Sequence, residues 1–519
     1  MVLGLFLTTL ISVLAIINPY VSGMIVDDVI TGGNYALLPR LIAILLGVTA
    51  VRGILRYCYQ VVFETCSQGM LYAMRDKVYR KLLQEDFAFY NRKRTGDLMS
   101  RQTGDMDAIR HFVAYVIYAV YENILLFIFA LIMIFTVNTK LALLMMAVLP
   151  FTAVNTYLQS KEVKPAFRRN WNCFSSLNAF VQENISGNRV VKAFAKEGYE
   201  IQKFNKENDA FRAAQLDASK IWMKYVPVFE ILSNALTIIL MLYGGYMAIK
   251  GEITLGNLVT VNGYLWMLTV PLCMAGWWVN DIQNFATSVE KIYDTYTEEP
   301  SVKTPEGCKE RRHLNGSVDF HDVSYQADGE VLVDGINVKN MNLYDLRDNI
   351  GMAMQDVFLF SDTIEGNIAY ARPDCPFEEV KHAAIMADAN HFIQALPDGY
   401  DTIVGERGVG LSGGQKQRIS LARALLKDPA ILILDDTTSA VDMETESYIQ
   451  TQLKKLQTRC TIFIIAYRIS SIKDADLILV MDNGRIIERG THEELVAQNG
   501  YYAAAFRNQY GERPQLSDN

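Results

Sequence analysis

Three features are scarce in this 519-residue sequence, and each scarcity excludes a class of protein. No long run of basic residues occurs and the net charge is −8, so nothing supports binding to nucleic acid. The seven cysteines include no CxxC pair and no repeated spacing, so neither a zinc site nor a disulfide framework is indicated. Charged residues are rare in long stretches of the first half, which indicates that this half lies in a lipid bilayer.

Six apolar runs have about the length needed to cross hydrocarbon. They lie at 1–26, 41–62, 112–137, 141–158, 225–249 and 258–279. The first run lacks the basic start of a signal peptide, so it is predicted to be a spanning helix and not a leader. The connections 67–112 and 161–224 carry nine and twelve Lys/Arg residues, whereas the other three connections carry one each. By the positive-inside rule, the two long connections and both chain ends are predicted to be cytosolic.

Four charged residues lie inside these apolar runs, where charge is costly. They are Arg52, Arg56, Glu122 and Glu230. Two explanations are open. The charges could line a polar translocation cavity, or the two arginines, four residues apart, could snorkel or pair with carboxylates of neighbouring helices.

The stretch 411–442 carries the most specific motif. Its residues 412–414, Ser-Gly-Gly, open a predicted helix, and glycines at a helix N-terminus suit a phosphate. The apolar residues 431–434 then predict a short buried strand that delivers Asp435 and Asp436 to its carboxyl edge. In open α/β sheets, ligands bind at that edge.

As written, LSGGQ followed by a strand ending in Asp435 resembles the signature and Walker B motifs of ATP-binding cassette (ABC) proteins, and SAVD resembles their D-loop. The segment MAMQDVFLF around Gln355 resembles the Q-loop. The resemblance implies that Asp435 and Gln355 ligate Mg²⁺. It implies that the following residues contact ATP: Ser412, Gly413, Gly414, Gln415 and Asp442.

Segments 90–101 and 183–194 resemble the intracellular stretches of six-helix ABC exporters. In that family the turns between such helices dock on the nucleotide domain, which implies a first coupling helix near 103–108 and a second near 197–204. The implied fold is multidomain. It comprises an all-α six-helix transmembrane domain at 1–293, a linker at 294–315, an α/β ABC ATPase domain at 316–510 and a polar tail at 511–519.

The loop that holds the phosphates in such a domain, GxxxxGK[ST], occurs nowhere in the sequence. In the family it follows the first strands, predicted here at 318–325. Only the five residues Gln326 to Glu330 separate Tyr325 from Val331, whereas a strand, loop and helix need roughly 30 or more. The Walker A segment is therefore absent between 326 and 330. Either an internal segment has been lost or skipped in this sequence, or the chain does not bind nucleotide through a P-loop of its own.

Two catalytic positions depart from the family. The resemblance places Asp436 where the family usually has a glutamate that polarises water, and a carboxylate displaced by about 1 Å can lose roughly 100-fold in rate. It places Tyr467 where the family has a switch histidine, and a tyrosine hydroxyl does not titrate near neutrality. Both changes predict that an ATP site built on this chain's own Walker B motif hydrolyses slowly or not at all.

The intact signature predicts a partner. In this family two cassettes dock head to tail, so residues 412–415 would cap an ATP held by the P-loop of a second chain. The resemblance thus implies a heterodimeric exporter in the cell membrane, using ATP and Mg²⁺ to move a small hydrophobic or amphipathic substrate. Two alternatives stay open: a homodimer in which Asp436 suffices, and a non-transporting regulator or inactive remnant.

Overall fold

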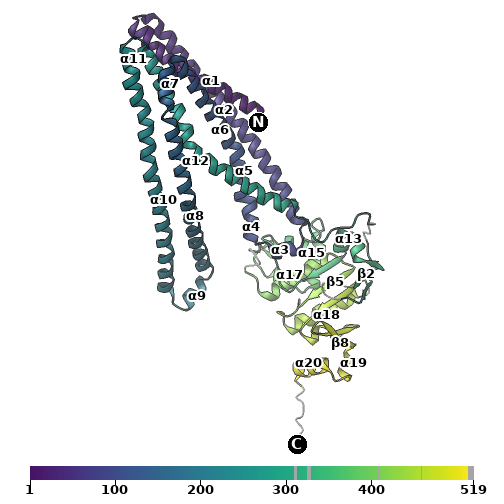
Figure 1. Cartoon of the computed structure of the whole chain (residues 1–519). Helices are drawn as coiled ribbons and strands as arrows, with labels where there is room; N and C mark the ends of the chain where they lie inside the picture. Colours follow the sequence, from purple (N-terminus) through teal and green to yellow (C-terminus); the bar gives the residue numbers. More distant parts are fainter. Residues whose placement is uncertain (309–312, 324–328, 406–409, 458, 512–519) are drawn as a thin grey trace. The chain divides into compact units, whose positions relative to one another are not determined.

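The computed structural model describes residues 1–308, 313–323, 329–405, 410–457 and 459–511 (Figure 1). The chain divides into two compact units, Met1–Ser301 and Val302–Asn519, and the division falls inside the predicted linker. The predicted absence of a Walker A segment between 326 and 330 falls largely on residues 324–328, which are outside the described residues, as is the tail 512–519.

The first unit is helical. Its described residues contain six helical segments that are long and apolar enough to cross a membrane, as predicted. The long helices are α1 (Val2–Met24), α2 (Leu38–Gln84), α6 (Ile117–Val137), α8 (Leu149–Ser186), α10 (Glu197–Ile239) and α12 (Leu255–Thr297). The shorter helices are α3 (Phe87–Arg92), α4 (Thr95–Ser100), α5 (Met106–His111), α7 (Thr139–Met146), α9 (Asn188–Ala193) and α11 (Gly245–Ile249).

Helix α1 packs against α2, α6 and α12, while α8 and α10 run side by side as a long hairpin with α9 at its turn (Figure 1). At one end of the first helix, the Oδ1 atom of Asp27 accepts a hydrogen bond from the Gly256 N–H at 2.7 Å. Further along, the Tyr264 hydroxyl donates to the Ile16 carbonyl oxygen at 2.8 Å. Both donors are shielded from water, so these two hydrogen bonds help to hold α12 against α1.

The positions predicted for the two coupling helices do not coincide with turns in the structure. Residues 103–108 lie inside an unbroken helical stretch from 95 to 137, and 197–204 form the first turns of α10. The turns are instead at α3 and α9. Asp86 caps α3 by accepting from the Phe89 N–H at 2.8 Å, and the helix before α9 ends at Gly187. Composition could not locate these turns because charged helix continues on both sides of each one.

The second unit contains three small sheets. The antiparallel sheet consists of β1 (Val318–His321), β2 (Glu330–Val333) and β3 (Ile336–Asn337). The parallel sheet has the order β4 (Ile350–Ala353), β5 (Ile431–Asp435), β6 (Thr461–Ile465). The hairpin pairs β7 (Ile478–Asp482) with β8 (Arg485–Gly490). The predicted strand at 431–434 is confirmed. Strand β6 forms where the apolar run 461–465 predicts a strand, and the hairpin turns where Asp482, Asn483 and Gly484 predict a turn.

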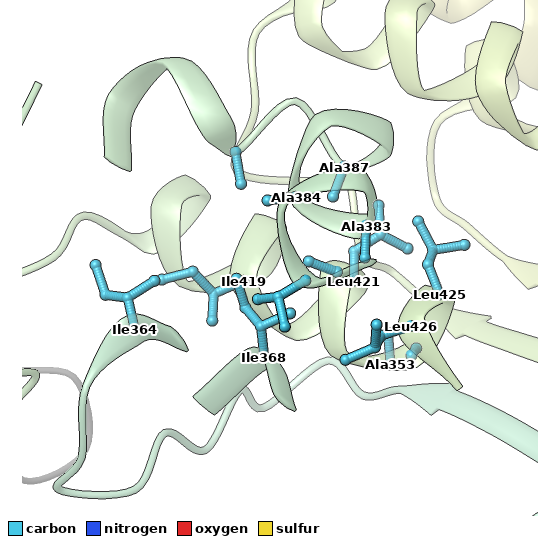
Figure 2. Packing of buried hydrophobic residues seen from close by; sticks show 14 of the residues in the cluster. Ala353, Ile364, Ile368, Ala383, Ala384, Ala387, Ile419, Leu421, Leu425 and Leu426 are labelled. Atoms are coloured by element: carbon cyan, nitrogen blue, oxygen red, sulfur yellow. The ribbon is translucent and has the colours of Figure 1, made fainter. Parts of the chain in front are cut away.

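Eight α-helices accompany these sheets in the described residues. They are α13 (Leu343–Asp348), α14 (Ile364–Ala369), α15 (Phe377–Met386), α16 (Asn390–Gln394), α17 (Gly413–Leu426), α18 (Met443–Leu456), α19 (His492–Ala497) and α20 (Tyr501–Tyr510). Figure 2 shows the largest core of this unit, in which Ile419 of α17 lies among Ile368 of α14 and Ala384 of α15. All three side chains are fully buried, so the middle of α17 is packed into this core.

Strand β6 is an edge strand. Leu432 and Leu434 of the central strand β5 are buried, whereas none of the equally apolar residues of β6 is buried, and Ile465 is 56 % exposed. Within the residues that the structure describes, no strand pairs with the second edge of β6. Strands of parallel sheets are normally buried on both faces, and β6 departs from this pattern.

Candidate functional site

Three predicted site residues follow neighbouring parallel strands. The register pairs Asp435, the last residue of β5, with Ile465, the last residue of β6. Gln355 lies two residues beyond β4, and Tyr467 lies two residues beyond β6. The strands are parallel, so all three residues come to the same carboxyl edge. The expectation that the β5 strand delivers its carboxylates there is confirmed.

Asp436 has an unusual backbone. Its φ is 48°, in the left-handed region, and its N–H donates to the Ile465 carbonyl oxygen at 2.8 Å. The residue is 8 % exposed. Left-handed non-glycine residues persist where surrounding contacts determine them, and they gather at functional sites. The sharp turn after β5 thus separates the directions of the two consecutive carboxylates.

The first turn of α17 is closed by a capping box. The Ser412 Oγ accepts from the Gln415 N–H at 3.3 Å, and the Gln415 Oε1 accepts from the Ser412 N–H at 2.9 Å. Ser412 and Gly413 are exposed. The exposed N-terminus of a 14-residue helix suits an anion. The Gln415 side chain, expected to contact ATP, is engaged within its own helix.

Gly414 is required by close packing. A Cβ at this position would lie 2.7 Å from the Ala440 carbonyl oxygen, whereas a Cβ at Gly413 would meet its nearest atom, the Ala440 Cβ, at 3.6 Å. Gly414 is buried and Gly413 is exposed. The two glycines therefore have different roles: Gly414 lets the segment 438–441 approach the helix, and Gly413 leaves the helix end open.

Asp442 is the N-cap of α18. Its Oδ1 accepts from the Thr445 N–H at 2.9 Å, and its Oδ2 accepts from the Thr445 hydroxyl at 3.1 Å. These bonds, the backbone one first, hold the pKa of the Asp442 carboxyl below its usual range. The motif that suggested a contact with ATP thus has an immediate local role in starting a helix.

Sequence reasoning missed Gln417, which connects the signature helix to the D-loop. Its Nε2 donates to the Asp436 carbonyl oxygen at 3.3 Å and to the Ser439 Oγ at 3.1 Å. Its Oε1 accepts from the Ala440 N–H at 3.1 Å. The side chain is 7 % exposed. A glutamine on the apolar stripe of a helix was the available signal, because buried polar groups need partners.

Sequence reasoning also missed Arg468, which follows Tyr467. Its guanidinium donates to the carbonyl oxygens of Ser439 at 2.9 Å and Val441 at 3.2 Å, and lies 3.7 Å from the buried Glu446 carboxylate. Tyr467 itself is 76 % exposed, and only its backbone is fixed, by a 2.8 Å hydrogen bond from Gln509.

Arg423 ties the segment after Gln355 to the signature helix. Its guanidinium donates to the Phe358 carbonyl oxygen at 3.1 Å and to the Asn367 Oδ1 at 2.9 Å. The same Asn367 Oδ1 accepts from the Phe360 N–H at 2.9 Å. A displacement of the Gln355 loop is therefore communicated to α17 through charge-assisted hydrogen bonds.

The carboxyl edge suits a magnesium ion better than a triphosphate. Asp435 and Gln355 offer the oxygen ligands that Mg²⁺ prefers, yet no group of three His, Cys, Asp or Glu side chains in the described parts of the chain could hold a metal alone. The nearby Arg468 guanidinium is occupied by backbone oxygens. At this edge the described residues thus offer carboxylate and amide oxygens as ligands.

The first unit is an apolar domain with six long helices. The second is an α/β unit with a carboxylate at a strand edge and a helix that begins with glycine. Together they define the class of membrane proteins in which a helical membrane domain is fused to a nucleotide-binding domain. Residues 1–272 match the ABC transporter transmembrane region, and residues 320–439 match the ABC transporter domain. The chain belongs to the ABC transporter family, and it is a multi-pass membrane protein. The family's cassette domain binds ATP.

The chain is similar to several relatives over most of its length. It is 36 % identical to the uncharacterized ABC transporter ATP-binding protein YknU of Bacillus subtilis, over 98 % of this chain and 95 % of the relative. It is 33 % identical to a putative multidrug export ATP-binding/permease protein of Staphylococcus aureus, over 87 % and 86 %. A solved structure of a bacterial Atm1-family ABC exporter with ATP bound is 25 % identical, has a TM-score of 0.83 and covers 99 % of both chains.

Proposed function

We propose that this chain is one half of an ATP-driven exporter that moves a small hydrophobic or amphipathic substrate out of the cytosol, with both chain ends in the cytosol. Similarity to a relative named for multidrug export and to an exporter structure supports this direction of transport. The proposal rests mainly on the exposed helix N-terminus at Ser412 and Gly413. The sequence around the neighbouring strands contains no phosphate-binding loop motif.

The partner in this proposal is a second, different half-transporter. Its P-loop holds ATP and Mg²⁺, and the α17 N-terminus of this chain caps the phosphates from the other side. Asp436 has a shorter side chain than the usual glutamate, and Tyr467 replaces a titratable histidine, so the partner supplies the competent catalytic groups. A subunit with a degraded site and an intact signature is useful only in such a pair.

ATP hydrolysis by purified chains tests the heterodimer. We expect this chain alone to show no turnover above background, and the co-purified pair to hydrolyse ATP. In the pair, Gly413→Glu should abolish turnover because a carboxylate at the helix N-terminus repels the phosphates, whereas Tyr501→Glu on α20, equally exposed, should leave it unchanged. Robust turnover by this chain alone would instead support the homodimer.

Cross-linking tests the geometry. A cysteine placed at Gly413 should cross-link to a cysteine in the partner's phosphate-binding loop when ATP is trapped, and not in its absence. A cysteine at the exposed Tyr344 on α13 serves as the control position. Capture of the partner by the control and not by position 413 would contradict the proposal.

We also propose that an internal segment is missing between the first strands and Val331. The alignment with YknU runs over 558 positions although this chain has 519 residues, so the relative carries residues opposite gaps in this chain. The uncovered edge of β6 is where an added parallel strand could pair. Sequencing the coding DNA across Gly329 and Glu330 tests this directly.

Whether this segment is missing also distinguishes a working transporter from an inactive remnant. If the native protein has an intact mass of 58.6 kDa, the cell makes these 519 residues and no more, and the chain is a P-loop-free subunit. A heavier native protein would show that the chain has its own phosphate-binding loop. A native chain of 58.6 kDa that supports neither ATP hydrolysis nor transport with any partner would identify the inactive remnant.

A further inference from the structure

Two arginines and one glutamate form a charged cluster between two membrane-spanning helices. The Arg56 Nη2 of α2 lies 3.5 Å from the Glu122 Oε1 of α6, so one of the two arginines pairs with a carboxylate of a neighbouring helix, which was one of the two explanations left open. Arg52 lies one turn earlier on the same face of α2. Its Nε is buried and has no hydrogen-bond partner among the residues that the structure describes.

By their sequence positions, the two arginines fall inside an apolar run and not at its ends. Arg52 is near the middle of the apolar run 41–62, and at 1.5 Å per residue it is about 15 Å from either end of that run. An arginine side chain that reaches for water from the middle of the bilayer must cross much of a leaflet. Arg52 is therefore held at depth, where it needs a local partner.

Aromatic rings adjoin the charges. Tyr59 and Phe63 continue the Arg52 and Arg56 stripe along α2, one and two turns further on. The ring centroid of Tyr118 on α6 is 5.0 Å from that of Tyr59 and 5.2 Å from that of Phe63. All three rings are buried, so they support the charged residues from within the helix packing and leave the guanidinium groups as the surface that a ligand can reach.

The charges of the cluster do not cancel. Two guanidinium groups face one carboxylate, and the Arg56 side chain is 57 % exposed whereas that of Glu122 is 11 % exposed. Apart from these three residues, the six apolar runs contain one formal charge, Glu230. Glu230 is exposed on α10, which packs along α8. The outward surface of the cluster is therefore cationic.

We propose that the Arg52, Arg56 and Glu122 cluster binds the anionic head of the transported substrate, so that the exporter selects amphipathic anions with a carboxylate, phosphate or sulfonate group. This rests on the proposed export function and names its substrate class. The guanidinium groups donate paired hydrogen bonds to the head oxygens, and Glu122 holds Arg56 in place. A cationic amphiphile of the same size is repelled.

Equilibrium binding without nucleotide tests the inference separately from ATP-driven transport. The full complex is placed in nanodiscs of phosphatidylcholine alone, and dodecyl phosphate, dodecyl trimethylammonium and dodecyl maltoside are added below their micellar concentrations. The three probes share one chain and differ in head charge. We expect dodecyl phosphate to bind at least about tenfold more tightly than the other two, because two charge-assisted contacts are available.

Variants locate the effect. Arg52→Gln should raise the Kd for dodecyl phosphate about tenfold or more. The double variant Arg56→Gln and Glu122→Gln, which removes one charge of each sign, should raise it by a similar factor. Glu122→Gln alone should lower the Kd for dodecyl phosphate or leave it unchanged, because loss of the carboxylate makes the cluster more positive. Glu230→Gln is the matched control and should change none of the three affinities. Thermal melting of each variant checks that it is folded.

The outcomes are distinct. Equal binding of the three probes, or unchanged anion binding in folded Arg52→Gln and in the double variant, overturns the inference and leaves the arginines as structural groups. Anion binding that appears only when an anionic lipid is absent and vanishes with phosphatidylglycerol present identifies a lipid head group as the stronger ligand of the same site. Selective anion binding without any ATP-driven transport would retain the site and reject the export function.

Discussion

Gln417 holds the backbone of Asp436: its Nε2 donates to the Asp436 carbonyl oxygen at 3.3 Å, while its Oε1 accepts from the Ala440 N–H at 3.1 Å. One buried side chain of the signature helix therefore bridges both ends of the segment that follows the Walker B strand. Movement of the α17 N-terminus and of the Asp436 turn must be coupled through it.

Gln417→Met removes both bonds at nearly constant volume. We expect a loss of about 1–3 kcal/mol in stability of the second unit, because the Ala440 N–H and the Asp436 carbonyl are left buried without their partner. Hydrogen–deuterium exchange of a peptide covering 436–441 should become faster. Gln394→Met, at an exposed position on α16, is the control and should leave the exchange unchanged. Unaltered exchange in Gln417→Met would refute the bridge.

Gly414→Ala and Gly413→Ala form a matched pair. The first places a methyl group 2.7 Å from the Ala440 carbonyl oxygen, so we expect destabilisation of about 1–3 kcal/mol and loss of ATP hydrolysis by the heterodimer. The second has ordinary van der Waals contact at 3.6 Å and should keep its melting temperature. Equal melting temperatures for both variants would contradict the packing role of Gly414.

Asp436 offers a test of backbone strain. Its φ of 48° suits Asn and Gly but not a β-branched residue. Asp436→Asn should keep the melting temperature, whereas Asp436→Val should cost about 1–2 kcal/mol from the backbone alone. Differential scanning calorimetry of the purified complex measures both. Equal stability of the two variants would show that the left-handed turn is absent.

The Asp86 carboxylate gives a pH dependence. Hydrogen bonds from the Ser301 hydroxyl, the Phe89 N–H and the Ser301 N–H lower the pKa of Asp86 to about 2. A carboxyl whose pKa is lowered on folding adds stability above its ordinary pKa of about 3.9, and this contribution is lost as the pH falls from there towards 2. The difference in melting temperature between the native chain and Asp86→Ala should therefore be constant above pH 5 and shrink below pH 4. A difference that grows on acidification would reverse the assignment.

Cys460 should be slow to react. Burial raises the pKa of its thiol to about 11. At pH 8 only about one thiol in a thousand is then ionised, so alkylation by iodoacetamide should be roughly 100-fold slower than at an ordinary exposed cysteine. Mass spectrometry of labelled peptides can compare it with the exposed Cys66 of the same chain. Equal labelling rates would mean that the strand β6 opens readily.

The sequence predicted the parts whose signals are local. The strand at 461–465 is an apolar run between polar residues, and the β7–β8 turn has Asn483 and Gly484 at φ of 46° and 76°, the conformation that Asn-Gly turns favour. The S-x-x-Q pattern at 412–415 is a capping-box pattern that motif matching obscured.

The rest depends on contacts between distant parts of the chain. Nothing near Gln417 in the sequence indicates that it faces Asp436, since that contact exists only when α17 lies on the β5 turn. The turns at α3 and α9 were misplaced because single caps, such as Asp86, decide where a charged helix stops. Asp442 was assigned to ATP through the motif, and its capping bond to Thr445 became visible only in three dimensions.

The edge strand β6 also bears on how the protein behaves before it meets any partner. Five consecutive uncharged residues, TIFII, lack proline and present one row of backbone donors and acceptors without a neighbour in the described part of the chain. Such an edge templates the addition of a further strand, including the same segment of another copy. Newly made chains would then aggregate through their own nucleotide domains, and solubility in the cell would depend on how quickly those five residues are covered.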